Sequence, residues 1–481
     1  MLFSKINLDN DKPLYIRIEE EIVKLMAEGM LVEGSKLPST RELSEVLKVS
    51  RNSCMHAYEL LEDKGYTKVI KGRGAFICHN LIKKEQQWQI DWSSKVSAYG
   101  KKAVELDIMK HEAVTKKQMI SFKSIAPDEK LFNLEHIRRD FLNSISLEGA
   151  KLYNYGYARG YKPLMDYLKL YMKNKGSDLA DKEILITNGF TEGFDITLQA
   201  ISCAGDTILC ENPTHNTAIK LMKLNGLNIE GIDIEQGIIN TQQLKEKLKK
   251  SKIKFLYLTP SYHNPTGTVM SAEKRKEIYE LCKSYNVPII EDGFNEELLY
   301  SSSHISSISA LAGKDNSIIY IGSFSKILFP GIRIGWIMAD KALIDTLESI
   351  KRSRNIHSSV IDQAFLYEYL RSGDYEIYLK KARKYYRDKY KFVIDYANKY
   401  LTHCKIYGEG GLHIFVELYN IDARLLLEKA MDKGVIFMPG DIFHIHEKGK
   451  NTFRLGFSRL EPEAIEKGIK LLGQCIQELT K

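Results

Sequence analysis

The sequence has no apolar run that approaches the roughly 18 residues a helix needs to cross a membrane. Its start, MLFSKINLDNDKPLY, lacks the charged-then-apolar layout of a secretory signal. The seven cysteines are scattered and no two form a CxxC pair, so neither a zinc site nor a disulfide framework is expected. We therefore expect a cytoplasmic protein without a membrane span or a bound metal.

The 481 residues exceed what one hydrophobic core organises, so two or three domains are expected. A net charge of +8 suits a nucleic-acid partner, although lysine-rich proteins are often merely soluble. The distribution of charge is more informative than the total. Residues 36–75 contain eight Lys and Arg against five acids, so we expect any DNA-facing surface in this part of the chain.

The first eighty residues show the pattern of a small helical domain with a hairpin. The segment PLYIRIEEEIVKLMAEGML has apolar residues at helical spacing. Ser39 and Glu42 have the spacing of a capping box, which predicts a short helix over 41–47, and Ser50 can cap the helix that follows. Two short helices joined by a tight turn form a helix-turn-helix. The segment YTKVIKGRGAFI then alternates like a hairpin, which predicts a wing with Arg73 at its tip.

The chemistry of this segment suits DNA. A helix that starts Ser50-Arg51-Asn52 presents a hydroxyl, a guanidinium and an amide, the groups that contact phosphates and base edges in the major groove. Arg73 between two glycines can reach a minor groove or a phosphate. Helix-turn-helix geometry also occurs where no DNA binds, and a lone arginine is usually a solvated surface residue. The combination of capped helices, an Arg-Asn start and a basic wing favours DNA binding.

The segments PLYIRI, GSKLPSTREL, VSRNSCMHAYELLEDKGY and GRGAFI resemble the GntR-type winged helix-turn-helix, over nearly all of residues 12–77. The resemblance implies a DNA-binding domain over residues 1–79 whose dimers read paired half-sites in double-stranded DNA. The candidate DNA-binding residues are Ser39, Thr40, Arg41, Ser50, Arg51, Asn52 and Arg73.

Residues 80–120 are rich in Lys and Gln and show little sustained periodicity. Paired lysines here could add phosphate contacts, but a solvated tether is the commoner role of such a segment. We interpret 80–120 as a linker with room for a short helix.

From about residue 121 short apolar strands alternate with helices, which predicts a mainly parallel sheet flanked by helices. In such sheets ligands bind beyond the carboxyl ends of the strands. Five chemically distinctive residues follow strand ends in this pattern: Gly189, His215, Asn264, Asp292 and Lys326. The sequence therefore predicts that they meet at one edge of the sheet.

These residue types match the functional groups of one cofactor. Lys326 can form a Schiff base with an aldehyde, and Asp292 can keep a buried ring nitrogen protonated. Asn264 can hydrogen-bond a ring hydroxyl. Each signal is weak alone, since a lysine after a serine is usually on the surface and NPTG is usually a turn.

A phosphate site is also predicted. The helix that begins after Gly189 offers free N–H groups to an anion, and Ser323, Ser325 and Arg333 add donors and charge. An aldehyde, a pyridine nitrogen, a phenolic oxygen and a phosphate together describe pyridoxal 5′-phosphate.

The motifs NPTG (264–267), ED (291–292), SFSK (323–326), GIRIGW (331–336) and FRLGFS (453–458) resemble those of fold-type I aminotransferases, over roughly residues 121–481. The resemblance implies an α/β domain with a smaller C-terminal α+β subdomain, in which Lys326 is the Schiff-base lysine. It also implies that Arg454 clamps the carboxylate of an amino-acid ligand, the alternative being a strand arginine in a surface ion pair. The implied cofactor-binding residues are Gly189, Phe190, Thr191, His215, Asn264, Asp292, Phe294, Ser323, Ser325, Lys326 and Arg333.

Two positions depart from that family's pattern. His215 stands where an aromatic residue such as tyrosine usually stacks on the ring, and a histidine offers less area and a pH-dependent charge. Phe294 stands where a tyrosine hydroxyl often reaches the ring oxygen. Both departures put efficient transamination in doubt more than cofactor binding.

A GntR-type domain joined to an aminotransferase-like domain resembles the MocR-type transcriptional regulators. That resemblance implies a homodimer that senses pyridoxal phosphate, sometimes together with an amino acid, and the segment 153–164, YNYGYARGYKPL, resembles one that feeds the dimer interface. Two alternatives stay open. The chain could be an active aminotransferase with an appended DNA-binding domain, or a DNA-binding protein with a vestigial cofactor site.

Overall fold

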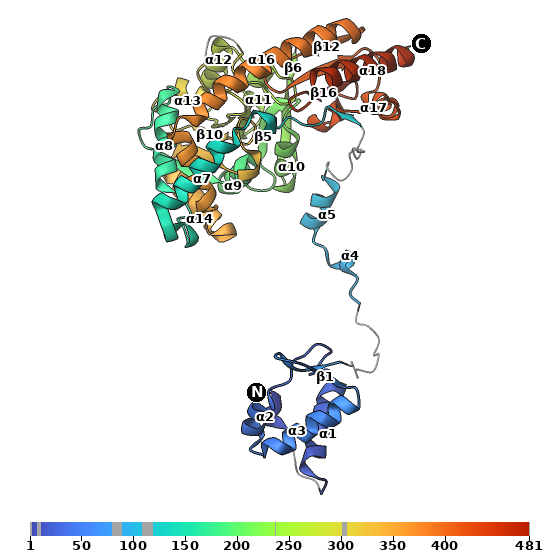
Figure 1. Cartoon of the computed structure of the whole chain (residues 1–481). Helices are drawn as coiled ribbons and strands as arrows, with labels where there is room; N and C mark the ends of the chain where they lie inside the picture. Colours follow the sequence, from blue (N-terminus) through green and yellow to red (C-terminus); the bar gives the residue numbers. More distant parts are fainter. Residues whose placement is uncertain are drawn as a thin grey trace. The chain divides into compact units, whose positions relative to one another are not determined.

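The structure is a computed structural model that describes residues 2–6, 11–78, 89–107, 119–235, 237–300 and 305–480. The chain divides into two compact units, Met1–Val96 and Ser97–Lys481 (Figure 1). We call them the N-terminal unit and the C-terminal unit. Residues 80–88 and 108–118 of the predicted linker lie outside the described residues.

The N-terminal unit is the predicted winged helix-turn-helix. Ser39 accepts a hydrogen bond from the backbone N–H of Glu42, whose carboxylate accepts one from the Ser39 N–H, so the predicted capping box is confirmed. Ser50 caps the next helix by accepting from the Ser53 N–H at 3.1 Å. The elements are η1 (Leu2–Lys5), α1 (Leu14–Ala27), α2 (Thr40–Leu47), α3 (Arg51–Asp63), β1 (Thr67–Ile70) and β2 (Gly74–Ile77).

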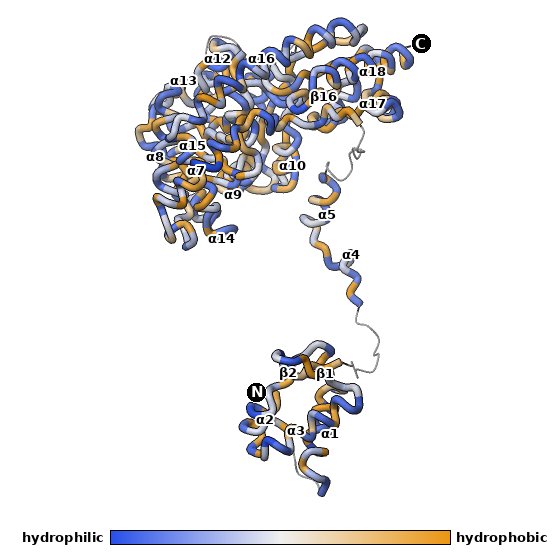
Figure 2. Tube along the Cα trace, in the orientation of Figure 1, coloured by the Kyte–Doolittle hydropathy of each residue, from blue (hydrophilic) through white to orange (hydrophobic). Residues whose placement is uncertain are grey.

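Two short helices lie in the described part of the linker, residues 89–107. They are α4 (Trp92–Lys95) in the N-terminal unit and α5 (Ala98–Glu105) in the C-terminal unit. Helix α5 packs against α10 (Asn216–Leu224), where Lys220 and Asp107 form an ion pair at 3.8 Å. Figure 2 shows both hydrophobic and hydrophilic positions along α5, as a helix that packs on one side requires.

An eight-stranded sheet forms the centre of the C-terminal unit. Its strands are parallel except β11 and β7, each of which runs antiparallel to its neighbours. In spatial order they are β4 (Lys182–Thr187), β11 (Gly335–Asp340), β10 (Ile318–Ser323), β9 (Ile289–Asp292), β8 (Ile253–Leu258), β5 (Thr207–Asn212), β6 (Asn228–Glu235) and β7 (Ile238–Ile239).

Helices cover both faces of this sheet (Figure 1). Alternate residues of the strands pack on each face, so two apolar layers form. One face packs against α9 (Gly189–Ile201), α10 and α14 (Lys341–Asn355). The other face packs against α8 (Lys162–Asn174), α11 (Thr241–Lys250), α12 (Ala272–Ser284), α13 (Ile308–Leu311), α15 (Val360–Arg371) and the first part of α16 (Asp374–Tyr400). Outside these layers lie α7 (Leu134–Glu148), η2 (Glu129–Leu131), η3 (Gly149–Tyr153) and η4 (Pro330–Ile332).

A smaller subdomain follows at the C-terminal end, with its own apolar core. Its antiparallel sheet runs in the order β12 (Cys404–Tyr407), β13 (His413–Leu418), β16 (Thr452–Gly456) and β15 (Met438–Pro439), with η5 (Gly440–Phe443) between β15 and β16. The helices are the second part of α16, α17 (Ala423–Asp432) and α18 (Pro462–Thr480), while β14 (Val435–Ile436) pairs with β3 (Ile120–Ser121). The predicted fold class is confirmed. No described helix has the length and apolar character needed to cross a membrane.

Candidate cofactor pocket and nucleic-acid interface

A cavity of about 180 Å³ lies at the carboxyl ends of strands β9 and β10. Nine of the predicted cofactor-binding residues line it, whereas Gly189, Asn264 and Arg454 do not. Of the five residues predicted to meet at this edge of the sheet, His215, Asp292 and Lys326 line the cavity, and Gly189 and Asn264 do not. The full lining is Phe190, Thr191, His215, Thr217, Asp292, Gly293, Phe294, Asn295, Ser323, Ser325, Lys326, Pro330 and Arg333.

Lys326 lies three residues beyond the end of β10 and lines the cavity. Burial lowers the pKa of its ammonium group to about 8, and the guanidinium groups of Arg454 and Arg333 contribute to the same shift. A neutral amine is the form that attacks a carbonyl carbon. The site therefore makes a larger share of Lys326 reactive near neutral pH than free lysine would have.

Asp292 is the last residue of β9 and its carboxyl group is buried. Burial raises its pKa to about 7, with the nearby carboxylates of Glu296 and Glu291 adding to the rise. The hydroxyl of Tyr257 donates to Asp292 Oδ2 at 2.9 Å and fixes the group's orientation. A protonated ring nitrogen in the cavity would reverse the pKa shift by stabilising the carboxylate, so Asp292 fits the predicted role.

An anion cradle lies at the start of α9. Gly189 has a φ of +78°, and a Cβ atom there would lie 2.5 Å from Arg333 Nη2, so only glycine lets the guanidinium approach this helix end. Arg333 donates to Ser325 Oγ at 3.2 Å, and the Ser325 N–H donates to Ser323 Oγ at 3.2 Å. The Asn188 side chain does not cap the helix, so the first N–H groups stay available to an anion. This cradle fits a phosphate group.

Two rings stand at the starts of α9 and α10. The imidazole of His215 and the ring of Phe190 have centroids 5.5 Å apart. Burial lowers the pKa of His215 to about 3, and the charges of Lys326 and Arg454 contribute to the same shift. His215 is therefore neutral at neutral pH, and the pH-dependent charge expected from the sequence is displaced far into the acid range. Phe294 lines the cavity without a hydroxyl, as the sequence dictates.

Arg454, on β16, is a buried cation, so the alternative of a surface ion pair is wrong. Its Nη1 donates to Asn264 Oδ1 at 2.7 Å, its Nη2 donates to the Lys123 carbonyl at 3.3 Å, and it lies over the ring of Phe443. Burial lowers its pKa to about 9. Within the described ranges it forms no ion pair, and its Nε has no hydrogen-bond partner. The bond to Arg454 also orients the Asn264 amide, leaving its NH₂ end as the donor.

Sequence reasoning missed five residues of this site. Gly293 is required because a Cβ there would lie 2.1 Å from the Tyr320 hydroxyl. Thr217, Asn295 and Pro330 each lie within three residues of a predicted one, so their nearness in sequence was the available signal. Tyr257 could have been suspected because a tyrosine inside an apolar strand needs a hydrogen-bond partner.

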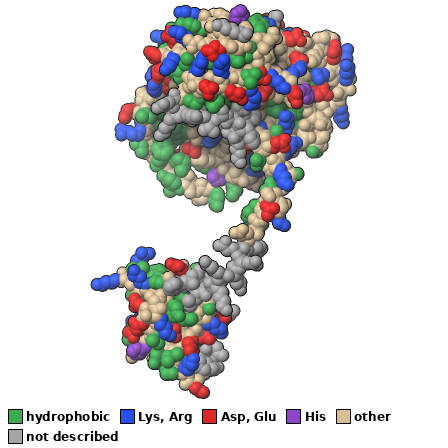
Figure 3. Space-filling model, turned by 90° about the vertical axis from the view of Figure 1, so that its right-hand side faces the viewer, with side chains coloured by type: hydrophobic (Ala, Val, Ile, Leu, Met, Phe, Trp, Pro, Cys, Tyr) green, Lys and Arg blue, Asp and Glu red, His purple; other side chains and the backbone are tan. Residues whose placement is uncertain are grey.

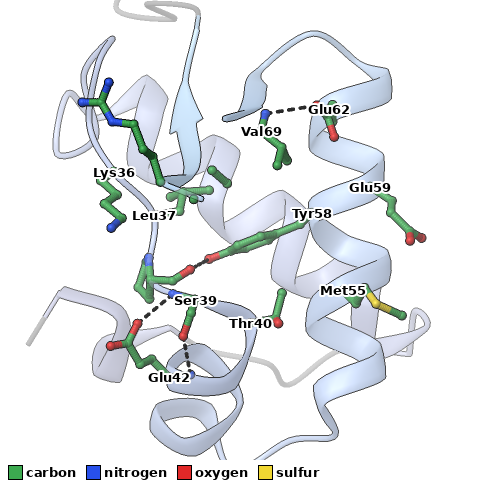
Figure 4. A pocket seen from close by; sticks show the side chains of 14 residues that line it. Lys36, Leu37, Ser39, Thr40, Glu42, Met55, Tyr58, Glu59, Glu62 and Val69 are labelled. Carbon is green, nitrogen blue, oxygen red and sulfur yellow. Dashed lines mark hydrogen bonds between the residues drawn. The ribbon is translucent and has the colours of Figure 1, made fainter. Parts of the chain in front are cut away.

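The N-terminal unit carries a second hollow of about 410 Å³, between α2, α3 and the hairpin. We call it the recognition groove (Figure 4). Of the predicted DNA-binding residues, Ser39, Thr40 and Arg73 line it. The Tyr58 hydroxyl donates to the Pro38 carbonyl at 2.8 Å and holds the start of α2 against α3. The groove is lined by Lys36, Leu37, Pro38, Ser39, Thr40, Glu42, Met55, Tyr58, Glu59, Glu62, Val69, Arg73, Gly74 and Ala75.

The remaining DNA candidates stand at the two helix starts beside the groove. Arg41 is exposed and pairs with Glu45 at 3.2 Å, and Arg51 Nε donates to Thr40 Oγ1 at 3.4 Å. Asn52 is exposed on the first turn of α3. Ser50 is committed to capping α3, so its hydroxyl stabilises the helix start. Figure 3 shows Lys and Arg side chains projecting from this unit, with acidic side chains among them.

Two family models match the chain. The family described as bacterial regulatory proteins, gntR family, matches residues 14–77, and the family described as aminotransferase class I and II matches residues 121–472. Each match covers one of the two kinds of site described above.

Similar proteins include regulators and enzymes. "Uncharacterized HTH-type transcriptional regulator YdfD" of Bacillus subtilis is 27% identical over 97% of this chain and 97% of its own. "Probable rhizopine catabolism regulatory protein MocR" of Rhizobium meliloti is 22% identical over 97% of this chain and 94% of its own. "Aromatic-amino-acid aminotransferase 1" of Thermococcus litoralis is 30% identical over 80% of this chain and 94% of its own.

A solved structure points to the cofactor. LysN, an alpha-aminoadipate aminotransferase of Thermus thermophilus complexed with N-(5′-phosphopyridoxyl)-L-leucine, has a TM-score of 0.74 and 25% identity, over 81% of this chain and 99% of its own. The phosphate cradle, the buried carboxyl group and the cavity lysine fit the same group. The chain belongs to the class I and II aminotransferase family and, with its GntR-family domain, is a MocR-type transcriptional regulator whose cofactor is pyridoxal 5′-phosphate.

Proposed function

We propose that the protein binds double-stranded DNA as a homodimer and changes that binding when its C-terminal unit takes up pyridoxal phosphate, with an amino acid as a second effector. The proposed layout is a DNA-binding domain over 1–79, a linker over 80–120 and an effector domain over 121–481. One observation carries the proposal: a chain that starts with a winged helix-turn-helix also gathers Lys326, Asp292 and a phosphate cradle around one cavity.

The proposed roles follow from the geometry. The bound cofactor supplies an aldehyde, which the Lys326 amine can attack. Asp292, oriented by the bond from Tyr257, would hold a proton at the ring nitrogen. Arg333 and the start of α9 would hold the phosphate, and His215 would stack on the ring. The NH₂ group of Asn264 would donate to the ring oxygen.

Arg454 is proposed to bind the carboxylate of the amino-acid effector. A buried guanidinium without an acidic partner is unfavourable unless an anion neutralises it, and burial already lowers its pKa to about 9. A carboxylate accepts two parallel N–H groups from one guanidinium, which selects carboxylates over other anions.

The linker helix α5 is the proposed connection between the cofactor cavity and the DNA-binding domain. It packs against α10, and α10 begins directly after His215, which lines the cavity. Helix α10 therefore connects His215 with the linker helix. Binding shifts the protein between arrangements only by its differential affinity for them.

The proposed dimer surface includes the segment 153–164. Tyr153, Tyr155 and Tyr157 expose 70%, 80% and 83% of their surfaces. Large exposed aromatic side chains so close together mark a protein interface, and a second copy of the chain is the occupant we propose.

An enzyme remains the second candidate. Lys326, Asp292 and Arg454 are the groups that an aminotransferase needs, and several relatives carry that name. Phe294 opposes this reading, because it places no hydroxyl at the cavity. Repeated turnovers with an amino-acid and keto-acid pair would establish the enzyme; a single half-reaction would fit a sensor.

The experiment is a footprint on DNA upstream of the protein's own gene, with and without pyridoxal phosphate and a panel of amino acids. We expect a protected pair of half-sites whose extent or affinity changes with the cofactor. Protein that takes up the cofactor without any change in protection would refute the sensor proposal, and protein that cannot take it up would support a vestigial site.

A further inference from the structure

Helix α3 carries one exposed apolar side chain among polar ones. Its apolar positions Cys54, Ala57, Tyr58 and Leu61 are buried in the core of the N-terminal unit. Met55 instead leaves 43% of its surface exposed. It therefore contributes little to the core, and its place on the helix calls for another partner.

Met55 faces the recognition groove on the same side of α3 as Arg51. The two residues are four apart, so their side chains are neighbours on the helix surface. Met55 lines the groove together with Thr40 at the start of α2 and Val69 on the hairpin, as Figure 4 shows. Val69 is also exposed, over 52% of its surface. The groove thus offers exposed apolar side chains as well as the basic side chains of Lys36 and Arg73.

The charges around Met55 limit which part of the DNA can contact its side chain. Glu59, one turn further along α3, is exposed and also lines the groove, as does Glu62. Two carboxylates repel phosphates, so a backbone contact at this point of the helix is unfavourable. A base edge is a better neighbour, and the only apolar group on the major-groove edge of the bases is the C5 methyl of thymine.

We propose that Met55 reads thymine in each half-site by packing its thioether side chain against the C5 methyl group. Methionine is flexible and polarisable, so it can follow a methyl group across a groove whose exact depth varies. The proposal rests on the DNA-binding function above and adds a base preference to it. Arg51 and Asn52 supply hydrogen bonds, while Met55 supplies an apolar contact one turn later.

The test replaces thymine by uracil, which removes the methyl group and nothing else. Each thymine of the footprinted site is replaced in turn, and the affinities of the wild-type protein, Met55→Ala and Met55→Leu are measured. We expect one thymine in each half-site at which wild type loses about three- to fivefold, as expected for burial of one methyl-sized group. Met55→Ala should lose the same factor on natural DNA and be insensitive to uracil there, and Met55→Leu should keep the sensitivity.

Two further measurements keep the outcomes separate. The salt dependence of binding should be unchanged in Met55→Ala, because no phosphate contact is lost. If every uracil affects wild type and Met55→Ala equally, Met55 does not read thymine and the proposal is wrong. If instead Arg51→Ala binds as well as wild type does, the DNA-binding assignment itself has failed.

Discussion

The two units use charge in opposite ways. In the N-terminal unit the basic side chains are exposed, as with Arg41, which keeps 79% of its side chain in solvent beside Glu45. In the C-terminal unit Arg454 is buried and Lys326 is half-buried, and desolvation moves the pKa of Lys326 to about 8 and that of Arg454 to about 9. Exposed charges attract a large polyanion at little cost to folding, whereas buried charges hold a small ligand and become reactive.

The largest effect is expected at Lys326, the lysine that lines the cavity. Lys326→Ala should abolish the visible absorbance band of the bound cofactor, because no other described lysine lines the cavity. Lys326→Arg is the matched control, since it keeps a positive charge but cannot form the imine. An unchanged band in both variants would show that the cofactor is bound elsewhere.

The next largest effect belongs to the exposed arginines. Arg51→Ala and Arg73→Ala should each weaken operator binding by about ten- to a hundredfold and reduce its salt dependence. Lys24→Ala, an exposed lysine on α1 of the same unit, serves as the control and should bind normally. Cofactor uptake should be the same in all three variants. If Lys24→Ala weakened binding as much as the other two, general charge and not the proposed surface would hold the DNA.

The pH dependence of cofactor uptake tests whether the site lowers the pKa of Lys326. Because the neutral amine of Lys326 is the reactive form and its pKa is about 8, the rate of cofactor uptake should rise about tenfold per pH unit up to pH 8 and then level off. Stopped-flow absorbance across this range checks it. A rate that keeps rising toward pH 10 would mean that the lysine has its ordinary pKa and that the site does not desolvate it.

The smallest effect concerns the link between the units. Lys220→Ala should remove the ion pair with Asp107 and loosen α5 from α10. Such a partly exposed pair contributes little, so we expect the cofactor-dependent change in DNA affinity to fall by about two- to threefold. Affinity without cofactor, and cofactor uptake, should not change. Lys223→Ala, on the same helix, is the control, and an equal loss there would remove the ion pair from the explanation.

The sequence predicted the local features well and the long-range contacts poorly. The capping box at Ser39 and the hairpin with Arg73 at its tip depend on neighbours in the chain, so spacing alone predicts them. The bond from Tyr257 to Asp292 depends on the pairing of β8 with β9, which no local pattern specifies. The bond between Arg454 and Asn264 joins different subdomains across 190 residues.

The linker is a second case in which the sequence predicted a local element but not its long-range contact. Its composition predicts a tether with room for a helix, and α5 is indeed there. That α5 packs on the helix which follows His215 could not be predicted, because the contact depends on how two surfaces match after both have folded. Through this contact, the part of the predicted linker that forms α5 belongs to the C-terminal unit.

The most direct test is an operator-affinity titration with and without pyridoxal phosphate, on wild type and Lys326→Ala side by side. Pyridoxal phosphate should shift the operator-binding curve of the wild-type protein, which has the Lys326 amine. It should leave the curve of Lys326→Ala unchanged. Equal shifts in both proteins would contradict the idea that the Lys326 amine controls the affinity for DNA. So would the absence of any shift when the wild-type protein is fully loaded with cofactor.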